Sequence, residues 1–81
     1  MNDRITVSID AQEVLLSATR SGFARLASVC SRLASLTDDE LATPANHFHF
    51  MADMNNATTN SMPLVLQATT DDESFPNSRN A

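Results

Sequence analysis

Only one segment of this chain has the apolar spacing of an amphipathic helix, and segments with strand-like spacing lie on both sides of it. Residues 23–34 place apolar side chains three or four positions apart: Phe23, Leu26, Ala27, Cys30, Leu33 and Ala34. Such a stripe predicts a helix that buries one face. Polar residues with the same spacing are expected on its exposed side: Ser21, Arg25, Ser28, Arg32 and Ser35.

The end of this helix is predicted by charge. Three carboxylates follow in a row, Asp38, Asp39 and Glu40. Negative charge at a helix C-terminus is unfavourable to the helix dipole. We therefore expect the helix to end before these residues, or a separate short turn capped by Thr37.

Three segments have the alternation of strands with one buried face. Residues 5–9 alternate β-branched apolar residues with Thr6 and Ser8, and residues 64–69 alternate after Pro63, a residue tolerated at a strand start. Residues 47–52 place His47, His49 and Met51 on one face and the phenylalanines on the other. The phenylalanines are expected in the core.

Residues 11–19 allow two interpretations. Asp10 and Glu13 have the spacing of a capping box, which would start a helix running from Ala11 to about Leu36. That helix would contain Gly22 in its interior, at a cost of about 1 kcal/mol. In the alternative, Val14, Leu16 and Ala18 share one face of a strand and Thr19 caps the helix. We favour the strand.

The predicted order is strand, strand, helix, strand, strand. A chain of 81 residues is expected to form one small domain. We predict an α+β fold of ββαββ type, in which one helix packs on a mostly antiparallel four-stranded sheet. The domain is expected to span residues 1–70, and residues 71–81 are expected to be a disordered acidic tail.

Composition excludes several classes of partner. The net charge is −5 and lysine is absent, whereas nucleic-acid binding requires cations that neutralise phosphates. No apolar stretch approaches the roughly 20 residues that span a membrane, and the N-terminus lacks the pattern of a secretory signal. A single cysteine, Cys30, suits a reducing compartment. We therefore expect a cytoplasmic protein that binds neither nucleic acid nor membrane.

Both histidines lie in the segment "NHFHF", so metal binding and catalysis need to be considered. A zinc site needs at least one further ligand, from Asp53 or Cys30. Cys30 lies on the apolar helix stripe, which should pack on the face opposite His47 and His49. The same argument separates Cys30 from a histidine base. We therefore expect no metal, no cofactor and no enzymatic activity.

Two parts of the chain have distinctive residue patterns. The first is the strand-turn-helix segment that contains Ser21, Gly22, Phe23, Leu26 and Ala27. The second is His47-Phe48-His49-Phe50, followed by Asp53, a polar loop and an apolar strand. Together these parts resemble a family of small bacterial immunity proteins of polymorphic toxin systems, immunity protein family thirty-two. Ser21 stands where an acidic residue is more usual in the family. The resemblance implies a non-enzymatic protein that binds and neutralises a toxin, and it supports the strand at Glu13–Ala18.

With this resemblance, we expect an immunity-like protein-binding module that neutralises a cognate bacterial toxin by occlusion. A basic toxin would suit the acidic chain. The expected partner-binding residues are His47, His49, Asp53, Asp38, Asp39 and Glu40. The alternative is a small self-associating structural or accessory subunit, and a homodimer remains open under either interpretation.

Overall fold

The computed structural model describes residues 2–70, and the expected tail at residues 71–81 lies outside them. The elements are β1 (Ile5–Asp10), β2 (Glu13–Ala18), α1 (Arg20–Ala34), α2 (Asp38–Leu41), β3 (His47–Phe50) and β4 (Leu64–Gln67), with short 3-10 turns η1 (Pro44–Asn46) and η2 (Ala52–Met54). The α+β class is confirmed. The single four-stranded sheet is wrong, because β1 pairs only with β2 and β3 only with β4, both antiparallel.

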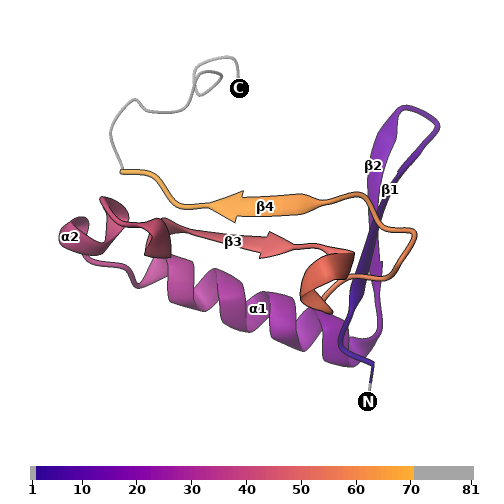
Figure 1. The fold of residues 1–81 in the computed structure, drawn as a ribbon, viewed down its shortest axis with the longest axis horizontal. Helices are drawn as coiled ribbons and strands as arrows, with labels where there is room; N and C mark the ends of the chain where they lie inside the picture. The colour runs from indigo at the N-terminus through magenta and orange to yellow at the C-terminus, as the bar shows by residue number, and fades with distance from the viewer. Residues whose placement is uncertain (1, 71–81) are drawn as a thin grey trace.

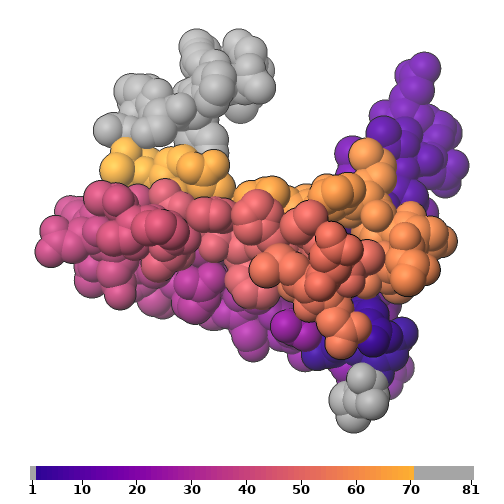
Figure 2. Space-filling view, viewed as in Figure 1, coloured from indigo at the N-terminus to yellow at the C-terminus, as the bar shows by residue number. Residues whose placement is uncertain are grey.

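The β1–β2 hairpin turns at Ala11 and Gln12, which both have positive φ angles, 52° and 71°. Such a two-residue turn matches the twist of the strands it joins. The strand interpretation of Glu13–Ala18 is therefore confirmed over the long helix. The hairpin stands across one end of α1, and its tip extends beyond β4 (Figures 1 and 2). Near the root its apolar face is buried, whereas at the tip Ile9 is 63% exposed.

Helix α1 begins as predicted: the hydroxyl of Thr19 accepts a hydrogen bond from the backbone N–H of Gly22. The predicted buried stripe is partly wrong. Gly22 and Val29 are buried and Leu26 and Leu33 partly buried, so the helix is rotated toward Val29. The other members of the stripe are exposed: Phe23, Ala27, Cys30 and Ala34.

Gly22 explains this rotation. A Cβ atom at this position would lie 2.9 Å from the backbone oxygen of Arg4 and 2.8 Å from the Cβ of Ala18. Only a residue without a side chain allows the helix to approach the hairpin this closely. The spacing of apolar residues fits both stripes, since they share Leu26 and Leu33, and the close contact selects the one centred on Gly22 and Val29.

After α1 the chain forms α2, whose N-cap is Thr37 with Glu40 completing a capping box. The predicted break before the carboxylates is therefore confirmed, and it places them in a first turn, where the helix dipole favours negative charge.

The core lies where the two hairpins meet α1. Its buried apolar residues are Ile5, Val7, Val29, Phe50 and Ala57. Phe48, Leu64 and Leu66 pack against them from the inner face of the β3–β4 hairpin, so the expected inward orientation of the phenylalanines is confirmed.

Residues 56–62 explain why the four strands do not form one sheet. This segment lies along the outer edge of β1, where Ile5 donates to the Asn56 carbonyl and Met62 donates to the Val7 carbonyl. The side chain of Asn56 occupies the edge of β3: its Oδ1 accepts from the Met51 N–H (2.8 Å) and its Nδ2 donates to the His49 carbonyl (2.9 Å). A loop thus takes the place of direct pairing between the hairpins.

Candidate functional site

The predicted site residues are organised around the outer face of the β3–β4 hairpin, the face turned away from the core. In the register of the two strands, His47 lies opposite Gln67 and His49 opposite Val65. Because side chains alternate along a strand, these four share the face opposite Phe48, Phe50 and the leucines. We call His47, His49, Val65 and Gln67 the outer face.

The two histidines are partly buried, and their rings contact each other edge to face with centroids 4.9 Å apart. Nδ1 of His47 lies 2.9 Å from Oδ1 of Asn46, so this ring has a local hydrogen-bond partner. Val65 is 48% exposed. The outer face therefore combines an apolar surface with polar ring atoms, a composition suited to contact with a protein.

The predicted acidic residues do not converge with the histidines into one cluster. Asp38, Asp39 and Glu40 are exposed on α2, which precedes β3, whereas Asp53 is exposed in η2, which follows it. Figure 1 shows α2 and the turn after β3 at opposite ends of the strand. The carboxylate of Glu40 also accepts from the backbone N–H of Thr37. The acidic residues thus flank the outer face at its two ends.

Cys30 occupies a different position from the predicted one. The thiol is free and exposed on α1, so the description of Cys30 as a buried apolar residue is wrong. Within residues 2–70, no group of three or more His, Cys, Asp or Glu side chains lies close enough together to hold a metal ion. His47 and His49 therefore remain a pair without a third ligand in this part of the chain.

Two shallow hollows near Arg4 were not predicted. Their volumes are about 260 and 330 Å3, and Arg4 and Thr58 line both. The guanidinium of Arg4 is already engaged, since its Nε and Nη2 both donate to Oδ1 of Asn55. The sequence gives no signal for these hollows, because they depend on residues 55–59 lying beside the start of β1.

Searches for similar proteins found no family model, curated protein or solved structure that matches this chain. In the part of the chain that the structure describes, no helix has the length and apolar character needed to cross a membrane.

Proposed function

We propose that this chain is a non-enzymatic, immunity-like protein-binding module that neutralises a cognate bacterial toxin by covering the toxin's functional surface. The observation that carries the proposal is the outer face of the β3–β4 hairpin, where the half-exposed Val65 lies directly opposite the partly buried His49. Interface cores are apolar and rich in rings, with charged groups at the rim. The resemblance to immunity proteins supplies the class of partner.

The charge distribution supports a basic partner. The exposed carboxylates of α2 lie at one end of the outer face and that of Asp53 lies near the other, and the whole chain has a net charge of −5. Acidic groups around a contact surface accelerate association with a basic protein and disfavour acidic ones. A cytoplasmic toxin that binds nucleic acid would present such a basic surface, since it must neutralise phosphates.

Growth rescue tests the proposal. The product of the gene adjacent to the one encoding this chain would be expressed from an inducible promoter, alone or together with this chain. The proposal predicts that expression alone arrests growth and that co-expression restores it. Rescue should be lost with Val65→Asp and kept with Val14→Asp, which makes the same change at an exposed valine of β2. An adjacent product that is not toxic, or rescue by both variants at equal abundance, would contradict the proposal.

A second candidate function, a self-associating accessory subunit, is favoured by a different surface. The outer edge of β2 has no hydrogen-bond partner among the described residues. This candidate shares no residue with the outer face, so the two can be tested separately.

A further inference from the structure

The two edges of the β1–β2 hairpin differ in how their backbone groups are satisfied. In an antiparallel pair, successive residues direct their N–H and C=O groups alternately toward the partner strand and away from it. The tight turn makes Asp10 and Glu13 a hydrogen-bonded pair, and the register then directs the groups of Ile5, Val7 and Ile9 outward on β1. Residues 56–62 satisfy the outward groups of Ile5 and Val7.

On β2, the same alternation directs outward the N–H and C=O groups of Val14, Leu16 and Ala18. Within the described residues, no hydrogen bond is made to these six groups. Natural sheets usually protect such an edge with a proline, a bulge or a covering loop. Strand β2, with the sequence EVLLSA, has neither a proline nor a bulge.

We propose that β2 pairs antiparallel with β2 of a second copy of this chain, so that two hairpins form one four-stranded sheet across a two-fold axis at Leu16. Two-fold pairing requires that residue i meets residue j and that j meets i. Only a register centred on Leu16 uses all the outward groups: Leu16 pairs with its own equivalent, and Val14 pairs with Ala18 of the second copy on both sides of the axis. This register forms six hydrogen bonds and leaves no outward group of the three residues unpaired.

The apolar side chains at this edge fit the same register. Val14 is 73% exposed, because it lies at the hairpin tip beyond the core. Pairing would place it beside the small Ala18 of the second copy, on the face where that copy's α1 packs. Phe23 belongs to the turn of α1 that contacts Ala18 and is 47% exposed. The dimer would therefore cover an exposed valine with an exposed phenylalanine on each side of the axis.

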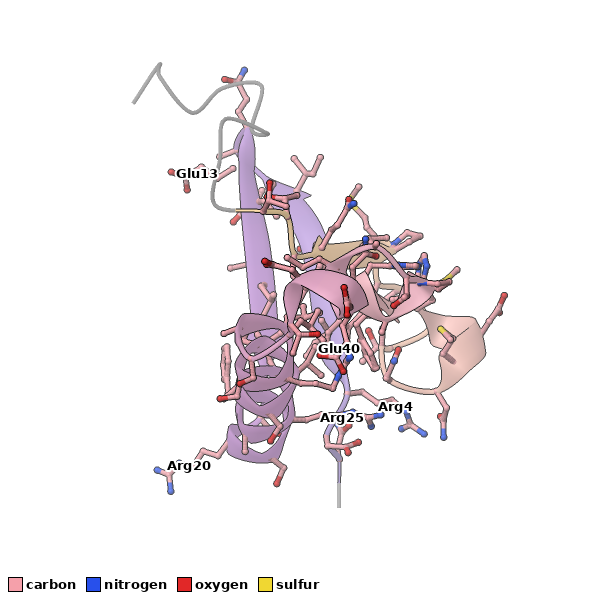
Figure 3. The ribbon with its side chains drawn as sticks, turned by 90° about the vertical axis from the view of Figure 1, so that its left-hand side faces the viewer. Arg4, Glu13, Arg20, Arg25 and Glu40 are labelled. Carbon is pink, nitrogen blue, oxygen red and sulfur yellow. The ribbon has the colours of Figure 1, made fainter. Side chains whose placement is uncertain are left out.

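Charge supports a second copy as the occupant rather than an unrelated strand. Figure 3 shows Glu13 near the tip of the hairpin and Arg20 near its root, on the same side of the molecule. In the Leu16-centred register, Glu13 lies opposite Thr19 of the second copy, next to Arg20. Opposite charges at the two ends of one strand therefore meet twice when the strand pairs with itself antiparallel.

Sedimentation equilibrium of the full chain across about 1–200 μM would test the dimer. A matched pair of proline substitutions separates an effect on the β2 edge from a general effect of proline on the hairpin. Ile9 and Val14 suit this comparison because they lie directly opposite each other in the hairpin and are both exposed. Proline at either position removes an N–H that makes no bond within the hairpin. Val14→Pro should weaken dimerisation at least tenfold, which corresponds to about 1.4 kcal/mol, whereas Ile9→Pro should leave it unchanged.

A charge exchange provides a second test that leaves the backbone unaltered. Glu13→Arg and Arg20→Glu should each weaken the dimer, and the double variant should recover it, since the opposite charges then meet in reversed positions. A wild-type chain that stays monomeric at 200 μM overturns the proposal. A dimer that Val14→Pro leaves intact, or that the double exchange fails to restore, overturns it as well. None of these variants alters the outer face, so the result does not depend on the toxin-binding proposal.

Discussion

Replacing Asn56 by alanine should destabilise the fold by about 2–6 kcal/mol. Asn56 is the only polar residue among the buried residues described, with 2% of its surface exposed. Its amide satisfies the N–H of Met51 and the carbonyl of His49. The truncation leaves both backbone groups without a partner, and each unsatisfied buried group costs about 1–3 kcal/mol. The total stability expected for a domain of this length is only about 4–12 kcal/mol.

Urea unfolding followed by far-ultraviolet circular dichroism would measure this effect, since the chain has neither Trp nor Tyr for fluorescence. With a slope of about 1 kcal/mol per molar urea, the midpoint should fall by about 2 M or more. Asn60→Ala is the matched control: Asn60 is exposed and accepts one hydrogen bond, from the Thr58 hydroxyl. The control should change stability by less than about 0.5 kcal/mol. Equal losses in the two variants would refute the role assigned to Asn56.

Asn56→Asp extends the same prediction to pH. A carboxyl in this buried position would face the carbonyl of His49, so its folded-state pKa should lie above the reference value of about 3.9. The folded state then binds the proton more tightly than the unfolded state. Relative to wild type, stability should be highest below pH 4 and fall by up to about 1.4 kcal/mol per pH unit as pH rises toward the folded-state pKa. A difference from wild type that does not change with pH would contradict this.

Two further predictions concern α1. Gly22→Ala should destabilise the protein by about 1–3 kcal/mol in urea unfolding, because the added methyl group would clash with the Arg4 carbonyl and Ala18. This cost is larger than the gain in helix propensity of about 1 kcal/mol. A more stable variant would show that the helix does not approach the hairpin this closely. Cys30 should react with a thiol reagent in the native state at one equivalent per chain, because it is exposed. If labelling required denaturant, Cys30 would be buried, as predicted from the sequence.

Helix caps and strand faces could be predicted from the sequence, because each depends on residues close together in the chain. Thr19 and Thr37 were both expected as helix caps, and both have the predicted role. The alternation of His47–Phe50 correctly assigned the phenylalanines to the core. These predictions depend only on neighbouring residues, because a cap or a strand face is defined within one turn or one strand.

Features that depend on distant residues could not be predicted in the same way. The buried stripe of α1 was misplaced because Gly22 closely approaches Arg4, which lies just before β1 and far from α1 in the sequence. The division into two sheets depends on Asn56. Asparagine is common in turns, but here its side chain bonds the Met51 N–H and the His49 carbonyl at the edge of β3. For the site, alternation placed His47 and His49 on one face, but it could not indicate that Gln67 and Val65 would lie opposite them across the hairpin.

Isothermal titration of the purified chain with the purified product of the adjacent gene would test the central proposal most directly. The proposal predicts saturable binding with a defined stoichiometry, weakened at least tenfold by Val65→Asp on the outer face and unchanged by Val14→Asp on β2, with both variants folded by circular dichroism. Absence of binding by the wild-type chain, or equal affinities for the two variants, would contradict a toxin-binding role for the outer face.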